Sequence, residues 1–166
     1  MKQSHNKKEE NSDAAIGRVP ETSVADIVDL EQMRHEETGY RPDLSYFTSE
    51  QGVRFAGRHL LIDLYGGERL DDIAHVEATL RAAVAAADAT LLHLDLHHFT
   101  ENSGVSGVAV LAESHMSIHT WPEAAYAALD VFMCGDADPF KAVPVLQEAF
   151  RPAKLNVTEH KRGVFE

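Results

Sequence analysis

The sequence contains a single cysteine, Cys134, so no disulfide can form within the chain. Disulfides belong to oxidising compartments, and a chain without one is typical of a reducing compartment. No apolar run approaches the roughly 20 residues that a membrane-spanning helix needs. Residues 1–13 (MKQSHNKKEENSD) also lack the apolar core of a secretory signal. We therefore predict a cytoplasmic protein that does not associate with membranes.

Basic residues are scarce as well. The chain has 15 Lys and Arg against 27 Asp and Glu, a formal net charge of −12. Nucleic acid and anionic membranes repel such a protein, so we predict neither as a partner. Hydrophobic residues make up 44% of the 166 residues, which suits one folded domain with an appended segment.

The appended segment is the polar N-terminal extension, residues 1–52. Residues 1–23 have too few large apolar side chains to bury a core. We expect disorder up to about residue 20 and weak structure from there to residue 52. Residues 24–30 (VADIVDL) have apolar side chains close to helical spacing, which favours at most a short docked helix. The folded domain is predicted to span residues 53–166.

Regular patterns begin near Phe55. Residues 58–66 (RHLLIDLYG) predict a strand that ends at a Gly-Gly pair. Residues 70–87 predict a helix, because their apolar side chains recur at the spacing of one helical face. Residues 90–99 (TLLHLDLHHF) alternate between apolar and polar, which predicts a half-buried strand. Its buried face is expected to carry Leu92, Leu94 and Leu96.

The remainder of the domain predicts mainly strands. Three follow one another at residues 106–114, 116–121 and 125–134, and a last one lies at residues 154–162. Residues 138–150 are helical in part, with Pro144 either kinking the helix or marking a start later than Pro139. The order is β-α-β-β-β-β-α-β. Helices separated by runs of strands predict an α+β fold, a two-layer sandwich of a largely antiparallel sheet with helices on one face.

Two of these strands carry zinc-ligand residue types on one face. The residues are His93, Asp95 and His97 on one strand, and His115, Ser117 and His119 on the other. No H-x-x-x-H pair on a helix and no cysteine pair accompanies them. The polar face of a half-buried sheet collects histidines without any metal, so we predict no metal site. A His/Asp metal-binding module is retained as a weak alternative.

A serine hydrolase is a second weak alternative. Ser106 lies in GVSGV, which only half resembles the G-x-S-x-G turn that exposes a nucleophilic serine between a strand and a helix. Histidines elsewhere in the chain could serve as its base.

A third chemistry suits the stretch AESHMSIHTWPE, residues 112–123. A serine hydroxyl at a tight bend can attack the carbonyl carbon of the preceding residue and turn the amide into an ester. A base then removes the Cα proton, the ester is eliminated, and the resulting dehydroalanine hydrolyses to a pyruvoyl group. Ser114 lies between two predicted strands, His119 could fold back on it, and Ser106 could donate to the oxyanion. The spacing permits this chemistry without demanding it.

The same residues resemble a known family. The stretch 104–136, GVSGVAVLAESHMSIHTWPEAAYAALDVFMCGD, is similar to the S-adenosylmethionine decarboxylase proenzymes of the short bacterial and archaeal type. The resemblance extends over about residues 57–163, and its ESH-x-SIHTWPE string is long and chemically unusual. It departs from the family at Ala124-Ala125, where bulkier residues or glycine are common, and it does not reach the N-terminal extension.

The resemblance implies a role for each residue of the motif. The chain would cleave itself between Glu113 and Ser114, and Ser114 would become the pyruvoyl cofactor. His119 would be the base that drives elimination during processing, and Ser106 would stabilise the processing intermediate. Cys134 would be the catalytic acid that protonates the product carbon, a role that suits a thiol.

The resemblance also implies the reaction. The pyruvoyl ketone would form a Schiff base with S-adenosylmethionine and accept electrons as CO2 leaves, supplying S-adenosylmethioninamine for spermidine and other polyamine biosynthesis. Trp121 and Phe99 would stack on the adenine, and Glu123 would bind the ribose hydroxyls. The cleaved protomers would form a homodimer. A pyruvoyl-dependent ornithine or arginine decarboxylase on the same scaffold stays open as an alternative.

Overall fold

The structure is a computed structural model that describes residues 43–45, 47–100 and 103–165. Pro42–Glu166 form one compact unit. The predictions of disorder up to residue 20 and of a short helix near residues 24–30 lie outside the described residues. In the part of the chain that is described, no helix combines the length and the apolar character needed to cross a membrane.

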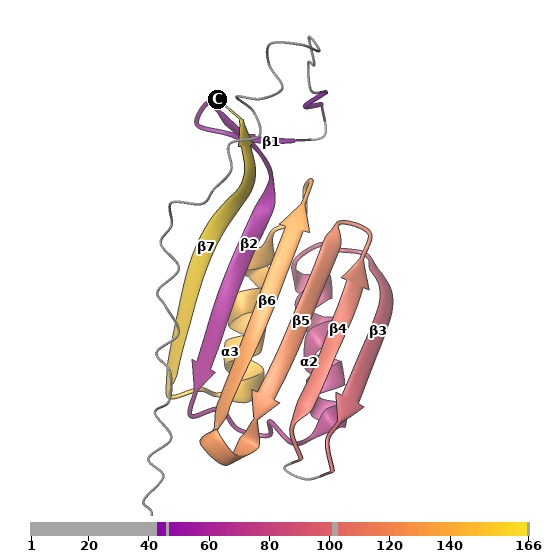
Figure 1. The fold of residues 1–166 in the computed structure, drawn as a ribbon, viewed down its shortest axis with the longest axis vertical. Helices are drawn as coiled ribbons and strands as arrows, with labels where there is room; N and C mark the ends of the chain where they lie inside the picture. The colour runs from indigo at the N-terminus through magenta and orange to yellow at the C-terminus, as the bar shows by residue number, and fades with distance from the viewer. Residues whose placement is uncertain (1–42, 46, 101–102, 166) are drawn as a thin grey trace, which may run out of the picture. The chain divides into compact units, whose positions relative to one another are not determined.

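The described residues form one antiparallel sheet of seven strands (Figure 1). The strands are β1 (Thr48–Glu50), β2 (Val53–Tyr65), β3 (Leu91–His98), β4 (Val105–Leu111), β5 (Ser114–Trp121), β6 (Tyr126–Cys134) and β7 (Lys154–Phe165). Their spatial order is β1-β2-β6-β5-β4-β3, and β7 pairs with β2 along its other edge. The predicted antiparallel sheet and α+β class are confirmed.

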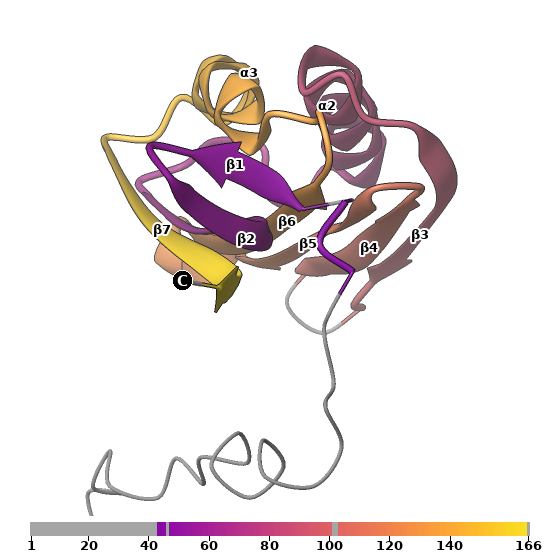
Figure 2. The same ribbon diagram turned by 90° about the horizontal axis from the view of Figure 1, so that it is seen from above.

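Two helices, α2 (Ile73–Ala86) and α3 (Ala142–Phe150), cover the same face of the sheet (Figure 2). Helix α2 begins later than predicted because Asp72 caps it and accepts a 3.0 Å hydrogen bond from the His75 amide. Helix α3 follows the short 3-10 turn η3 (Pro139–Lys141). Pro144 lies in its first turn, where an amide has no partner within the helix, so the proline is tolerated without a kink.

The core lies between the helices and the sheet. Alternate residues of β2, β5 and β6 point into it, as their period-2 apolar pattern predicts. Their fully or almost fully buried members include Leu60, Ile62, Leu64, Met116, Ile118, Leu129, Val131 and Met133. The helices contribute Val76, Leu80, Val84, Leu146 and Phe150. Among the described residues, no helix covers the other face of the sheet, called the open face below, which holds polar side chains and several exposed apolar ones.

Strand β3 departs from the predicted alternation at one residue. Its pairing with β4 shifts between Leu91 and His93, which marks a β-bulge. Leu91, Leu94 and Leu96 pack against the core, whereas Leu92 is 63% exposed. The prediction was right for Leu94 and Leu96 and wrong for Leu92, because a bulge moves the following residues to the opposite face.

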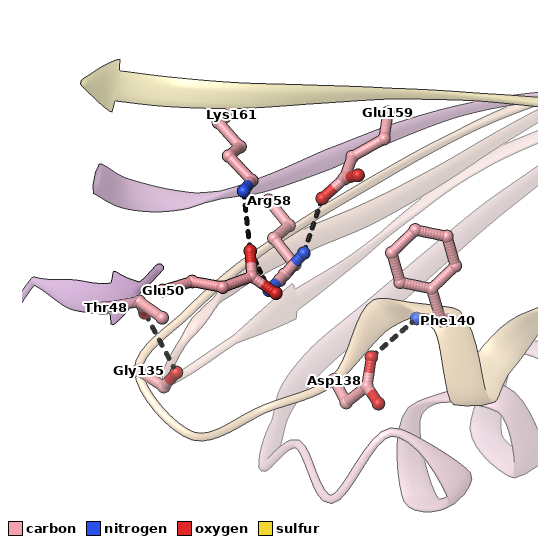
Figure 3. Close-up of polar contacts among 8 residues, drawn as sticks. All are labelled: Thr48, Glu50, Arg58, Gly135, Asp138, Phe140, Glu159 and Lys161. Carbon is pink, nitrogen blue, oxygen red and sulfur yellow. Dashed lines mark hydrogen bonds and ion pairs between the residues drawn. The ribbon is translucent and has the colours of Figure 1, made fainter. Parts of the chain in front are cut away.

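Strand β1 lies end to end with β6. Residues 53–55 of β2 pair with β1 and residues 57–65 pair with β6, while β7 occupies the other edge. Beyond the end of β6, Thr48 Oγ1 donates a 3.4 Å hydrogen bond to the Gly135 carbonyl oxygen (Figure 3). The sequence places the domain start at residue 53, whereas the sheet already includes Thr48–Glu50.

Ion pairs hold β1 against its neighbours (Figure 3). The Glu50 carboxylate lies 3.0 Å from the Arg58 guanidinium and 2.5 Å from the Lys161 ammonium. Arg58 also donates to Glu159 at 2.6 Å. These contacts lower the pKa of Glu50, chiefly through the hydrogen bond from Lys161. The short strand therefore joins the sheet through β2 and β7 together.

Candidate active site

The first group of predicted site residues meets where β4 turns into β5. Strand β4 ends at Leu111 and β5 begins at Ser114, so the predicted scissile bond lies in a tight turn. Ser114 pairs with Met133, which places it beside Cys134 although the two are far apart in sequence. The Glu113 carbonyl oxygen accepts hydrogen bonds from the Cys134 amide at 3.2 Å and from its Sγ at 2.7 Å.

Two donors thus converge on one carbonyl oxygen, the arrangement that stabilises an oxyanion during attack on a carbonyl carbon. Ser114 Oγ lies 3.2 Å from His115 Nδ1, a distance at which the imidazole can accept the hydroxyl proton. The backbone φ of Ser114 is 156°, a value that residues other than glycine rarely adopt. Backbone strain is therefore stored next to the bond expected to break.

The second group lies near the other end of β5. Ser106 on β4 pairs directly with His119 on β5, and Ser106 Oγ lies 2.9 Å from His119 Nδ1. Both residues line a cavity of about 700 Å³. Its walls also include the two aromatic residues expected to bind adenine, Phe99 and Trp121. Four of the predicted residues are therefore together at this cavity.

The two groups are separated within one chain. Strand β5 runs unbroken from Ser114 to Trp121, so the step from Ser114 to His119 covers roughly 16 Å at about 3.3 Å per residue. The expectation that His119 folds back on Ser114 is wrong for a single chain, because the extended backbone carries the histidine away. Ser106 moves away with it, because it is paired with His119.

An aromatic row continues from the cavity across the open face of the sheet. The rings of Trp121 and Tyr126 lie 5.3 Å apart, and those of Tyr126 and Tyr65 lie 5.2 Å apart. The Tyr126 hydroxyl donates to the Asp63 carboxylate at 2.6 Å. This bond is the main cause that raises the pKa of Tyr126 to about 12. Glu123 is exposed in the 3-10 turn beside this row.

Three polar residues near these groups were assigned no part in cleavage or substrate binding from the sequence. His115 contacts Ser114, and Thr90 contacts the Glu113 carboxylate through its amide and hydroxyl groups. Buried Thr120 accepts from the Val105 amide at 2.7 Å and donates to the Leu70 carbonyl at 2.8 Å. The sequence does place His115 beside Ser114. Thr90 and Thr120 depend on long-range packing that leaves no local pattern.

The chemistry available differs between the two groups. The Glu113–Ser114 turn offers a hydroxyl, an adjacent imidazole and two donors to the carbonyl, which suits attack on the bond itself. Ser106 is a strand residue and does not occupy the strand-to-helix turn of a hydrolase nucleophile. Among the described residues, no group of three or more His, Cys, Asp or Glu side chains is arranged to hold a metal ion.

Comparison with known proteins identifies the family. A model of S-adenosylmethionine decarboxylase matches residues 58–163. The chain belongs to the S-adenosylmethionine decarboxylase family. The match covers nearly the range over which the sequence resemblance was drawn, and it begins within β2. Strand β1 and the N-terminal extension precede it.

Individual members of the S-adenosylmethionine decarboxylase family are similar along most of their length. The S-adenosylmethionine decarboxylase proenzyme of Thermomicrobium roseum is 49% identical over 113 residues, which cover 68% of this chain and 97% of the relative. That of Methanococcus maripaludis is 47% identical over 113 residues, with 66% and 92% covered. The crystal structure of the adenosylmethionine decarboxylase from Aquifex aeolicus matches with a TM-score of 0.61 at 35% identity, covering 68% and 94%.

Proposed function

We propose that this chain decarboxylates S-adenosylmethionine, using a pyruvoyl group that it makes by cleaving its own Glu113–Ser114 bond. The observation that carries the proposal is the Glu113 carbonyl oxygen, which accepts from both the amide and the thiol of Cys134 while the Ser114 hydroxyl follows it in a tight turn. Family membership supports the same reaction, since the relatives are named decarboxylase proenzymes.

Cleavage begins with an acyl shift. Ser114 Oγ bonds to the Glu113 carbonyl carbon, its proton passes to His115 Nδ1, and the C–N bond breaks to free the Ser114 amine. The Cys134 donors stabilise the negative charge that builds on the Glu113 oxygen. A base then removes the Ser114 Cα proton, and the Cβ–Oγ bond breaks. Glu113 leaves as a carboxylate, and hydrolysis of the dehydroalanine releases ammonia and leaves the ketone.

In decarboxylation the ketone supplies an electron sink that bonds to the substrate amine. Cys134 then has a second task. Its thiol lies beside residue 114 and carries a proton that the product carbon can take once CO2 has left. Ser114 fits as the source of the ketone, because the residue is held between two strands and next to this acid.

The base that removes the Cα proton comes, in this proposal, from a second copy of the chain. His119 and Ser106 face the cavity, roughly 16 Å along β5 from Ser114. In a symmetric dimer, one copy would supply Glu113, Ser114 and Cys134, and its partner would supply the cavity. Each dimer would then contain two sites.

The open sheet face supports such a dimer. Within the part of the chain that the structure describes, large hydrophobic side chains of β2, β4 and β5 remain exposed on it, namely Leu61, Tyr65, Val108, Val110 and Trp121. Exposed apolar side chains on a sheet face that no described helix covers favour packing against another protein surface. A second copy, related by twofold symmetry, would bring each Ser114 turn toward the other copy's cavity.

The cavity favours a nucleoside over a basic amino acid. Its described lining contains two aromatic side chains, Phe99 and Trp121, and no carboxylate. Aromatic faces stack on adenine, whereas an ornithine or arginine side chain needs an acid placed for its cation. Glu123 lies two residues beyond Trp121, where its carboxylate could accept from ribose hydroxyls.

The test is an intact mass measurement of the purified full-length protein. We expect the fragments 1–113 and 114–166, with the second fragment blocked to Edman sequencing and CO2 released from S-adenosylmethionine. Ser114→Ala is the matched control and should stay uncut. A single intact chain after long incubation of the wild-type protein would rule out self-cleavage. CO2 release from ornithine or arginine in preference to S-adenosylmethionine would rule out the nucleoside substrate.

A further inference from the structure

Thr90, the residue before β3, makes three hydrogen bonds to the turn that contains the scissile bond. Its amide donates to Glu113 Oε2 at 2.8 Å, and its hydroxyl donates to Glu113 Oε1 at 3.1 Å. Its carbonyl oxygen accepts from the Ala112 amide at 3.0 Å. Thr90 therefore contacts both residues of the turn between β4 and β5.

The turn is held from its other side by β6. Cys134 donates to the Glu113 carbonyl oxygen through its amide and its thiol, as described above. Glu113 is thus fixed at its side chain by Thr90 and at its main chain by Cys134. The hydrogen bond from the Thr90 amide is also the main cause that lowers the pKa of Glu113. The side chain is ionised at neutral pH, and a charged acceptor strengthens both bonds from Thr90.

We propose that Thr90 is a positioning residue for self-cleavage, acting through the Glu113 carboxylate to hold the scissile carbonyl in line with the Ser114 hydroxyl. This inference rests on the proposed function. In the acyl shift, Ser114 Oγ must approach the Glu113 carbonyl carbon along a narrow path while the C–N bond breaks. A free glutamate in a two-residue turn rotates, and each rotation moves that carbon. Positioning of this kind lowers the barrier without any contact to the reacting atoms.

The two hydrogen bonds from Thr90 also give a reason for a glutamate at position 113, directly before the serine. Its two carboxylate oxygens match the two donors of Thr90, one on the main chain and one on the side chain. A glutamine keeps the length of the side chain but offers one carbonyl oxygen and an NH2 group that cannot accept. Glutamine in place of Glu113 should therefore keep one of the two bonds.

The experiment measures cleavage of the full-length chain made by cell-free translation, followed on gels over time. Thr90→Val removes the hydroxyl bond and keeps the side-chain shape, and we expect cleavage about three- to tenfold slower, the effect of one lost hydrogen bond. Thr90→Ser restores the hydroxyl and should cleave at the wild-type rate. Glu148→Gln, at an exposed position on α3 and so on the opposite side of the sheet from the open face, is the control and should also cleave normally.

A double-substitution cycle separates positioning from general stability. If Thr90 acts through Glu113, then Thr90→Val should add nothing to the slowing caused by Glu113→Ala. Melting temperatures of all variants are measured on Ser114→Ala backgrounds, where no cleavage intervenes. If the wild-type chain cleaves and Thr90→Val cleaves at the same rate, the inference is overturned and the proposed function stays intact. Effects that multiply in the double variant, or a failure of Thr90→Ser to restore the rate, would overturn it too. A wild-type chain that never cleaves would instead overturn the proposed function.

Discussion

The proposed division of the site between two chains makes a sharp prediction about mixed dimers. Ser114→Ala removes the nucleophile from one group of residues, and His119→Ala removes the base from the other. In a dimer that contains one chain of each kind, one site carries both defects and the other carries neither. Neither homodimer should cleave, whereas in the mixed dimer the His119→Ala chain should cleave and the Ser114→Ala chain should stay intact.

The length of β5 explains why neither homodimer should cleave, and the statistics of mixing give the expected number of cleaved sites. A base must approach within about 3 Å of the proton that it removes, and the roughly 16 Å between the two residues on one strand excludes action within the chain. Random mixing of equal amounts makes about half of the dimers mixed, and half of their sites are intact. About a quarter of the wild-type number of cleaved sites is therefore expected.

The assay uses two affinity tags. The two variants are co-expressed, mixed dimers are purified by successive steps on both tags, and each chain is followed by mass spectrometry. Hydroxylamine should cleave the ester that accumulates in the His119→Ala homodimer. A partner carrying both substitutions is the control and should rescue nothing. An uncut His119→Ala chain in the purified mixed dimer would refute the shared site. Full cleavage in the His119→Ala homodimer would show that His119 is not the base, and would direct attention to His115.

Four further predictions concern the chemistry and the fold. Cys134→Ala should still process in part, because the amide donor remains, but should release CO2 slowly; full turnover in a CO2 assay would end its role as the acid. Trp121→Ala should raise the KM for S-adenosylmethionine about 5- to 150-fold, the equivalent of losing one stacking contact of about 1–3 kcal/mol, and unchanged steady-state kinetics would contradict the adenine site. The hydrogen bond to Asp63 raises the pKa of Tyr126 from its usual value near 10 to about 12, so the stability that this bond contributes is complete below pH 10 and is lost as pH rises to about 12. The free energy of unfolding, measured by denaturation, should therefore fall less between pH 10 and 12 in Tyr126→Phe than in the wild type, and equal falls would argue against the bond. A chain that starts at Gly52 loses β1 and its solvated ion pairs, which contribute little to stability; it should melt a few degrees lower yet still cleave, and an uncut product would mean that β1 completes the fold.

The sequence predicted the elements well wherever local pattern decides the structure. Strands such as 58–66 were found because one face must be buried, and α2 was found because its apolar residues share a face. Leu92 was misplaced because a β-bulge changes the face without changing composition. The position of His119 could have been foreseen. Met116 and Ile118 alternate with polar residues, which already indicates one extended strand from Ser114 onward.

The sequence named candidate site residues but did not predict how they are arranged. Ser114, Cys134 and their shared carbonyl come together through the register of β5 with β6, and no local pattern reveals a register between strands. The same holds for Thr90, which is far from Glu113 in sequence and reaches it only because β3 and the turn lie at the same end of the sheet. The resemblance to a family named Ser114 and Cys134 before any geometry could, but it did not name Thr90.

The order of the strands has a consequence for the life of the folded molecule. The piece that ends at Glu113 would contribute β1, β2, β3 and β4, and the piece that begins at Ser114 would contribute β5, β6 and β7. These are interleaved, since β2 lies between β7 and β6. The pieces would stay together after the cut, but neither contains all the neighbours of its own strands, because β2 pairs with β6 and β7, and β4 pairs with β5. Folding is unimolecular before cleavage and would be bimolecular afterwards. An uncut molecule that unfolds can return by itself, whereas a cut one must find its other half at cellular dilution.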